Sequence, residues 1–463
     1  MKTSLKVTTA ALAISAFSVI GCEHTPTAGT DQQSTVADAS ACQVSAPYET
    51  AQFDNEFETK IDGLMAHMMD RGIAPGAVVQ ITQKGETVLK KAYGFADLED
   101  QKPMQTDSLF RIYSMTKAVT TIAALQLVDK GQLELDAPIS RYLPAFAEIK
   151  VATDETGAAT RPPSRAPTIR DLMRHTTGLT YRTGAKTDPI AAIYAKLGVP
   201  AGPGVSDAPT NGMDPVVGNE MFAERISMAP LKHDPGQQFT YGNSTDVLGA
   251  VVATVSGQSL SDYLDENIFI PTGMTDSSFI IDPKRQDDFT SAYIVPSQTP
   301  ARSSIDYTTP IDDLKPQTPY RVDPYRDGIY TKTPDFEFGG AGMVADADDY
   351  LAFTNALING SPRLVSPEIW AEASRDQLPA TAKAQDAFLD KRGFGLGFAV
   401  RESETHDGTV FPQCGLFWAG AASTYFWIDE ETETTGVLMT QVFESDVRSY
   451  FQELLNAIYA KPQ

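Results

Sequence analysis

Strand-like segments lie near both ends of the chain, and this distribution limits the folds that the sequence can adopt. Apolar runs at 77–82 and 87–93 flank a polar turn at 83–86 and predict a β-hairpin. The strands predicted near the other end are 394–401, 423–429 and 436–443. The simplest arrangement is one antiparallel sheet built from both chain ends and flanked by helices, with a mainly helical subdomain inserted between its two halves. The predicted class is therefore α/β, in the α+β sense.

Helical spacing marks both ends of this folded body. Apolar residues on one stripe predict an opening helix, namely Phe53, Phe57, Ile61, Leu64 and Met68. The residues that predict a closing helix are Phe451, Leu454, Leu455 and Ile458. We expect the sheet part to comprise about residues 53–135 and 330–463, and the helical part about 136–329. The helical part contains long loops rich in Pro, Gly and Ser, of the kind that usually line or cap a site.

The first residues have the pattern of an export signal. Lys2 and Lys6 precede an apolar run at 7–20, which is too short to span a bilayer as a stable helix. The end of the run, up to Cys22, resembles the bacterial lipoprotein processing box. This resemblance implies removal of residues 1–21, a lipid on Cys22, and an outer-membrane anchor with a periplasmic body in a Gram-negative cell. A plain secretory signal with an incidental cysteine is the alternative.

Residues 22–52 predict a flexible tether, because they are mainly Thr, Ser, Ala, Gln and Gly with few large apolar side chains. Cys42 lies in this tether and Cys414 near the far end of the chain, so a disulfide between them is permitted in an oxidising compartment. Since the tether offers no reason for fixed proximity, we expect two independent thiols.

Charge and composition argue against several classes of partner. The chain carries 37 Lys and Arg against 60 Asp and Glu, a net charge of −23, which opposes approach to nucleic acid. Its 3 cysteines and 5 histidines form no Cys-x-x-Cys pair and no His-Glu-x-x-His motif. We therefore expect no nucleic-acid partner, no metal and no cofactor, and the oligomeric state is left open.

A single Ser-x-x-Lys motif precedes an apolar helix. Ser114 lies at the predicted start of the helix at 118–128, and Lys117 follows one turn later, so the two side chains share a face. A serine hydroxyl needs an adjacent base to become a nucleophile, and a lysine becomes one when burial or a cationic neighbour lowers its pKa. The alternative is an ordinary helix cap beside a surface lysine.

Two later segments add groups that an active site could use. Tyr241 and Asn243 follow a loop and precede a helix at 245–255, which offers a phenol for proton relay and an amide for substrate contact. Small residues follow Trp418 at the entry to a predicted strand, where a backbone amide can stabilise an oxyanion. Taken singly, these features also fit a helix cap and a tight strand entry with a core tryptophan.

In this order, the three motifs resemble the serine β-lactamase and penicillin-binding protein superfamily, and most closely the class C β-lactamases and the family VIII carboxylesterases. Further segments that resemble these families are 168–179, 271–274 and 339–343. The likeness covers residue 53 to the C-terminus and implies a β-lactamase/transpeptidase-like fold. It also implies that Ser114 is acylated and that Lys117 and Tyr241 share the base and acid roles. The amides of Ser114 and Ala421 would form the oxyanion hole, and the implied substrate contacts are Asn243, Trp418, Ala419 and Gly420.

Trp418 departs from the β-lactamase pattern, which usually has Lys or His at this position to hold a substrate carboxylate. A neutral indole offers one donor and an apolar face, so it cannot replace that charge. Many family VIII esterases read Trp-Gly-Gly here, whereas this chain reads Trp-Ala-Gly, with the extra methyl group of Ala419. We therefore predict a carboxylesterase for small neutral esters, with a β-lactam-like substrate as the alternative.

Three other functions stay open at this stage: a class C-like β-lactamase, a D-amino-acid peptidase of cell-wall peptides, and a non-catalytic protein that binds cell-wall fragments. The joint presence of Ser114, Lys117 and Tyr241 argues against the last. His175 is a candidate triad histidine, but Lys117 and Tyr241 already supply a base, so we expect a structural role for it. The chain has no Gly-x-Ser-x-Gly elbow, which argues against an α/β-hydrolase.

Overall fold

The computed structural model describes residues 49–182, 188–203, 212–295, 311–326, 328–384, 389, 392–401 and 410–460. The expected export signal at 1–21, the expected lipidation site Cys22 and most of the tether lie outside the described residues and stay predictions. No helix in the described ranges is long and apolar enough to cross a membrane.

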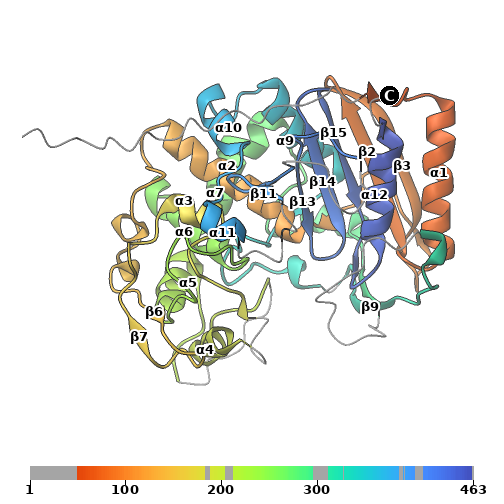
Figure 1. Cartoon of the computed structure of the whole chain (residues 1–463). Helices are drawn as coiled ribbons and strands as arrows, with labels where there is room; N and C mark the ends of the chain where they lie inside the picture. Colours follow the sequence, from red (N-terminus) through yellow and green to blue (C-terminus); the bar gives the residue numbers. More distant parts are fainter. Residues whose placement is uncertain are drawn as a thin grey trace, which may run out of the picture. The chain divides into compact units, whose positions relative to one another are not determined.

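An eight-stranded antiparallel sheet joins the two ends of the chain (Figure 1). Its strand order is β11-β12-β13-β14-β15-β2-β3-β4. The N-terminal strands are β2 (Gly76–Gln83), β3 (Glu86–Asp97) and β4 (Lys102–Pro103). The C-terminal strands are β11 (Gly393–Phe394), β12 (Ala399–Val400), β13 (Leu416–Gly420), β14 (Thr424–Asp429) and β15 (Thr434–Met439). Strands β15 and β2 form the seam, with Leu438 opposite Val79. The predicted antiparallel sheet built from both chain ends is confirmed.

The hairpin that joins β2 to β3 follows from its turn residues. Lys84 and Gly85 have φ of +52° and +80°. Two central residues with positive φ give a turn whose twist matches that of the flanking strands. The predicted hairpin is therefore present, and its turn lies where the sequence placed it.

Two pairs of helices cover the two faces of the sheet. They are α1 (Asn55–Asp70) with α12 (Val447–Ile458), and α2 (Thr116–Asp129) with α9 (Ala347–Asn359). Side chains of a strand alternate between faces. Val79 accordingly belongs to the apolar cluster that contains the α1 and α12 residues, and Val78 belongs to the cluster that contains α2 and α9 residues. The predicted opening and closing helices thus both exist, and the first begins at Asn55 because Asp54 caps it.

The predicted strand at 394–401 is wrong, because the chain turns back within it. Phe394 pairs with Ala399 as a short antiparallel hairpin between β11 and β12. Gly397, in the turn, has φ +86°, and a Cβ on it would lie 2.7 Å from the Thr121 hydroxyl. A close approach to α2 and a left-handed backbone therefore break the strand where the apolar run continues.

The predicted strand at 436–443 also divides. Its first part is β15, and its last part is β16 (Val442–Phe443), which leaves the main sheet. β16 pairs in parallel with β8 (Ala292–Ile294), which pairs in turn with β9 (Tyr320–Asp323). Continuous hydrophobicity did not reveal this change of partner, because both parts are buried.

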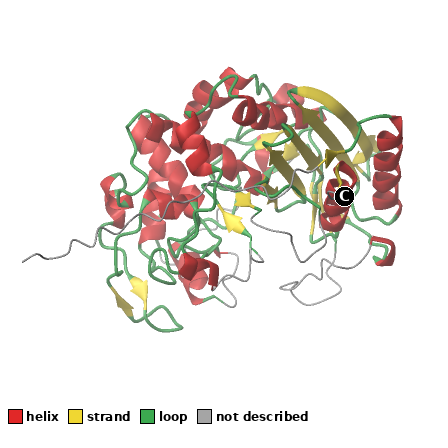
Figure 2. Ribbon diagram, turned by 45° about the horizontal axis from the view of Figure 1, so that its top comes forward, coloured by secondary structure: helices red, strands yellow, loops and turns green. Residues whose placement is uncertain are grey.

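The middle of the chain is mainly helical and lies beside the sheet (Figure 2). Its helices are α3 (Ile169–Met173), α4 (Pro189–Leu197), α5 (Gly218–Ser227), α6 (Ser244–Ser256), α7 (Leu260–Leu264) and α8 (Ile270–Thr272). Its small ribbon is β6 (Val151–Ala152) with β7 (Thr160–Arg161). The remaining elements are β5 (Phe110–Arg111), which pairs with β10 (Val344–Ala345), and the helices α10 (Pro367–Ala373) and α11 (Ala380–Ala384). Helix α6 packs against α2, so the starts of two buried helices are held in one core.

The N-terminal end of the described chain is joined to the C-terminal end. β1 (Glu49–Thr50) pairs with β17 (Tyr459–Ala460). Cys414 is disulfide-bonded, so the expectation of independent thiols is wrong for this residue. The pairing of β1 gives Glu49 and Thr50, at the end of the predicted tether, a fixed place that the tether composition did not reveal. Cys22 and Cys42 themselves lie outside the described residues.

Candidate active site

Ser114 lies in a 3₁₀ turn, Tyr113–Met115, that leads directly into α2. Tyr113, immediately before it, has φ +41°, a backbone conformation that costs a non-glycine residue about 1–2 kcal/mol. The Tyr113 ring packs edge-on against Phe443 with centroids 5.4 Å apart. The tertiary structure therefore holds a strained turn at Ser114.

Lys117 is buried, with 1% of its surface exposed, and it reaches the Ser114 hydroxyl. Its Nζ donates a hydrogen bond to Ser114 Oγ at 3.2 Å and another to the Gly340 carbonyl. Nζ also lies 4.9 Å from the centroid of the Tyr241 ring. The alternative of a surface lysine is therefore wrong. A buried amine in contact with a hydroxyl is placed to take its proton.

Tyr241 is positioned by a close approach between two loops. A Cβ on Gly242 would lie 2.6 Å from the Leu179 carbonyl oxygen, so glycine is required where the loop crosses this segment. The N–H of Thr240 donates to the His175 carbonyl at 2.8 Å. The segment around His175 is thus the support on which Tyr241 rests.

Trp418 lies inside β13, a strand that sequence reasoning did not separate from its neighbour. Its indole Nε1 donates to the Tyr241 hydroxyl at 3.2 Å. The Trp418 ring contacts the rings of Tyr241 and Phe394, with centroids 5.4 and 5.2 Å away. Trp418 therefore packs against Tyr241 at the candidate active site and does not simply fill the core.

The end of β13 approaches the turn of Ser114. A Cβ on Gly420 would lie 2.5 Å from the Ile112 carbonyl oxygen, two residues before the serine. Ala421 is exposed and begins the turn to β14, and Ala419 is half-buried. The strand end next to Ala421 thus approaches the turn of Ser114, and the oxyanion hole made by the two amides stays a prediction.

Asn243 is buried, and its amide nitrogen binds a neighbouring carboxylate. It is 2% exposed, and its Nδ2 donates to Asp246 Oδ2 at 2.7 Å. In the described part of the chain Asn243 Oδ1 has no hydrogen-bond partner. This oxygen is therefore an acceptor that the predicted substrate contact could use.

Sequence reasoning missed Asp246, in the first turn of α6. It is 1% exposed and accepts a hydrogen bond from the Gly340 N–H at 2.8 Å. Burial raises the pKa of its carboxyl, and the charge of Lys117 opposes that effect. An aspartate at the start of an otherwise apolar helix was the available signal.

Sequence reasoning also missed Tyr181, which lies two residues after the segment 168–179 that resembles these families. Its ring lies 5.5 Å from that of Tyr241 and 5.6 Å from Lys117 Nζ. Burial raises the pKa of the Tyr181 hydroxyl well above its usual range, and the neighbouring Tyr241 and Asp246 add to this. Hydrogen bonds with Tyr241 and Ser114 also act on this pKa. A protonated phenol therefore lies beside the serine.

His175 contacts the ring of Tyr241, with centroids 4.9 Å apart. It is 1% exposed, and it also packs against Phe239 and Phe394. Burial and the charge of Lys117 hold the pKa of His175 well below 6.5. These contacts agree with the expected structural role, in which a neutral imidazole supports Tyr241.

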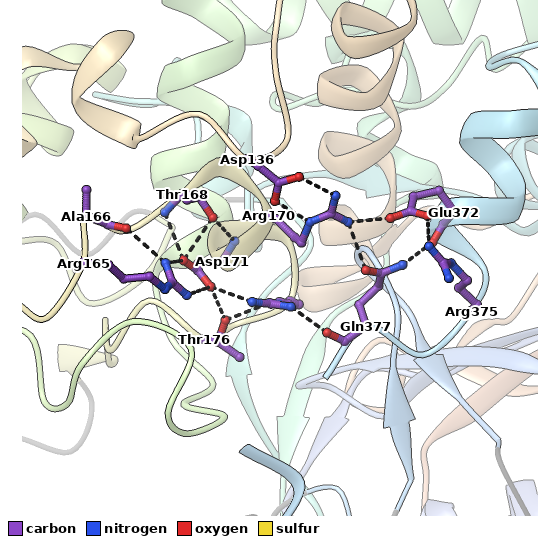
Figure 3. Close-up of polar contacts among 11 residues, drawn as sticks. Asp136, Arg165, Ala166, Thr168, Arg170, Asp171, Thr176, Glu372, Arg375 and Gln377 are labelled. Atoms are coloured by element: carbon purple, nitrogen blue, oxygen red, sulfur yellow. Dashed lines mark hydrogen bonds and ion pairs between the residues drawn. The ribbon is translucent and has the colours of Figure 1, made fainter. Parts of the chain in front are cut away.

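A network of ion pairs holds the segment that carries His175 (Figure 3). The buried Asp171 carboxylate binds Arg165 at 2.9 Å, Arg174 at 3.0 Å and the Thr176 hydroxyl at 2.7 Å. These interactions lower the pKa of Asp171 to about 2, although burial alone would raise it. The Asp171 carboxylate thus fixes the turn just before the segment around His175, on which Tyr241 rests.

We expect Asp171→Asn to lower the free energy of unfolding by roughly 2 kcal/mol at neutral pH, the value of the pKa difference between about 2 and 3.8. A depressed pKa stabilises the fold above the unfolded value and loses this effect as the pH falls towards about 2. Urea unfolding at neutral and acidic pH measures the difference, which should shrink in acid. The control is Asp136→Asn, whose side chain is 74% exposed in its ion pair with Arg170 and should cost less than about 1 kcal/mol. Equal losses in both variants would contradict the prediction.

Three carboxylates outside this site lie within 4.8 Å of one another, those of Asp276, Asp346 and Asp349. Asp276 pairs with Arg285, and Asp349 accepts the Ser277 hydroxyl at 2.9 Å. Burial and the neighbouring Asp349 raise the pKa of Asp346 to about 7. Arg285 and Ser277 thus already provide hydrogen-bond or ion-pair partners for the carboxylates of this cluster.

Comparison with known proteins agrees with the geometry. The profile of the family described as beta-lactamase matches residues 61–459. The chain belongs to the beta-lactamase family. Within this family, Protein Rv1367c of Mycobacterium tuberculosis is 31% identical over 389 residues, which are 81% of this chain and 88% of that protein.

Other members of the beta-lactamase family similar to this chain have named activities. Esterase EstB of Burkholderia gladioli is 30% identical over 408 residues, covering 83% of this chain and 91% of EstB. The structure described as EstCE1, a hydrolase with promiscuous acyltransferase activity, is 27% identical with a TM-score of 0.70. It covers 87% of this chain and 98% of EstCE1. The chain is thus an enzyme of the β-lactamase and esterase superfamily of serine hydrolases, as its motifs predicted.

Proposed function

We propose that this protein is a carboxylesterase that cleaves small neutral esters through an acyl-enzyme at Ser114. The observation that carries the proposal is the placement of Trp418 beside Tyr241. An indole whose N–H is bonded to a phenol presents an apolar face and no positive charge, which suits an ester better than a carboxylate-bearing substrate.

The proposed reaction begins at Ser114 and Lys117. Ser114 Oγ attacks the ester carbonyl carbon while its proton passes to the amine of Lys117. The amides of Ser114 and Ala421 stabilise the oxyanion, and Tyr241 relays the proton to the departing alcohol. A water molecule then attacks the acyl-enzyme, and the same groups return the proton to Ser114 Oγ as the acid leaves.

The relatives support this proposal. EstB is named as an esterase, and EstCE1 is described as a hydrolase. The description of EstCE1 also names a promiscuous acyltransferase activity. An acyl-enzyme of the kind proposed here would allow such a transfer when an alcohol replaces water as the acceptor. A β-lactamase remains the second candidate because the family and the nucleophile are shared.

We expect kcat/KM for a short-chain p-nitrophenyl ester to exceed that for a chromogenic cephalosporin on the same preparation. A charge-assisted hydrogen bond is worth about 1.5–3 kcal/mol, so the lack of a cation at Trp418 should cost the cephalosporin roughly 10- to 150-fold. Trp418→Lys should raise cephalosporin turnover relative to ester turnover. Trp418→Phe, which keeps an aromatic ring without the N–H, is the control for loss of the bond to Tyr241. A faster reaction with the cephalosporin would favour the β-lactamase.

A further inference from the structure

We propose that Asp246 is a positioning residue for Lys117, because its carboxylate balances the charge of the buried amine and fixes the carbonyl group that the amine contacts. The inference rests on the proposed function, since it assumes that Lys117 serves Ser114 as a base. It goes beyond the proposed function because it identifies Asp246 as the group that positions this base.

Gly340 connects Asp246 to Lys117. Its N–H donates to Asp246 Oδ1 at 2.8 Å, and its carbonyl accepts from Lys117 Nζ. A Cβ on this residue would lie 2.9 Å from Asp246 Oδ1, so only glycine allows the carboxylate to approach this closely. Thr120, one turn after Lys117, donates to the Gly339 carbonyl at 2.7 Å. Helices α2 and α6 therefore hold the same short segment from two sides.

Because Lys117 and Asp246 are both buried, their charges have to balance each other. Lys117 and Asp246 are each 1% exposed, and an unbalanced charge at such a site is costly. The second carboxylate oxygen accepts from Asn243 Nδ2, so both oxygens are held by donors. Burial raises the pKa of Asp246, and the charge of Lys117 opposes this effect.

The other titratable groups around this pair are aromatic or imidazole rings. Tyr181 responds to the charge of Asp246, and His175 responds to that of Lys117. Burial raises the pKa of Tyr181 well above its usual range and lowers that of His175 well below it, so both are neutral at pH 7. The Tyr241 ring contacts Lys117 through its face. Neither Tyr181 nor His175 supplies the negative charge that Asp246 supplies.

Asp246 adds a negative charge to the surroundings of the Lys117 amine. An amine must be neutral to take a proton from Ser114, and a nearby carboxylate favours its protonated form. Removal of the negative charge should therefore shift the acid limb of the pH profile to lower pH. An opposite charge close to a titratable group typically shifts its titration by about 1–3 units. A purely structural role would lower the rate at every pH without moving the limb.

The test measures the rate of covalent labelling of Ser114 by a fluorophosphonate from about pH 5 to pH 9, a range that brackets the optimum of a general base. Labelling reports the nucleophile directly and does not depend on the natural substrate. The main variant is Asp246→Asn, and Asp246→Ser is a second neutral variant. The control is Asp349→Asn, because Asp349 is also a buried carboxylate in the first turn of a helix and is 4% exposed. Thermal melts by circular dichroism establish that each variant folds.

The expected result is an acid limb shifted to lower pH by about one unit or more in the Asp246 variants and unshifted in Asp349→Asn. An unshifted limb in folded Asp246→Asn would overturn the inference and leave the nucleophile intact. If neither neutral variant folds, Asp246 is a structural residue and the inference fails. Absence of label on Ser114 in the natural protein would remove the proposed function and this inference together.

Discussion

Ser114→Ala is expected to abolish covalent labelling by a fluorophosphonate and to lower kcat/KM for esters by roughly 10⁴-fold or more, because the acyl-enzyme cannot form. Intact-mass measurement and peptide mapping of the labelled protein check the first part. Ester hydrolysis at matched protein concentration checks the second.

Ser108→Ala provides the control for the Ser114 experiment. Ser108 is also buried, at 2% exposure, and lies six residues before Ser114 in the same segment. Its hydroxyl accepts a hydrogen bond from the Gln105 N–H at 3.0 Å. We expect normal labelling in this variant. Label on a serine other than Ser114, or full activity in Ser114→Ala, would reject the proposed nucleophile.

Lys117→Ala and Tyr241→Phe should each lower kcat/KM by at least roughly 10²-fold while the protein stays folded, because proton transfer by a positioned group is typically worth 10²–10⁴. The double variant should lose less than the product of the two single effects, since Lys117 lies against the Tyr241 ring and the two groups act together. Steady-state kinetics on the three variants measure this coupling.

A second lysine–tyrosine contact, between Lys130 at the C-cap of α2 and Tyr263 in α7, provides a matched control. Lys130 Nζ lies 5.3 Å from the centroid of the Tyr263 ring, at the other end of α2 from Ser114. Lys130→Ala and Tyr263→Phe remove similar contacts without touching the site, so they should leave turnover near normal. Near-normal turnover in both Lys117→Ala and Tyr241→Phe would mean that another group is the base.

Local features could be predicted from the sequence because their geometry depends on a few neighbouring residues. The spacing of Ser114 and Lys117 places both side chains on one helix face, and the structure brings them to 3.2 Å. The turn at Lys84 and Gly85 likewise specifies its hairpin by backbone conformation alone. The antiparallel sheet from both chain ends was predicted from apolar runs near each end, which have to be buried together.

Only the tertiary structure determined which distant segments of the chain contact one another at the candidate active site. The Gly340 carbonyl, Asp246 and Tyr181 come from three separate parts of the chain, and no local pattern relates them to Lys117. The break at Gly397 depends on its contact with Thr121, more than two hundred residues earlier in the chain. Spacing thus predicted the contact between Ser114 and Lys117, because a helical turn fixes their distance. The groups that surround Lys117 are brought together only by packing between helices, because burial and long-range contacts arise only when the chain is folded.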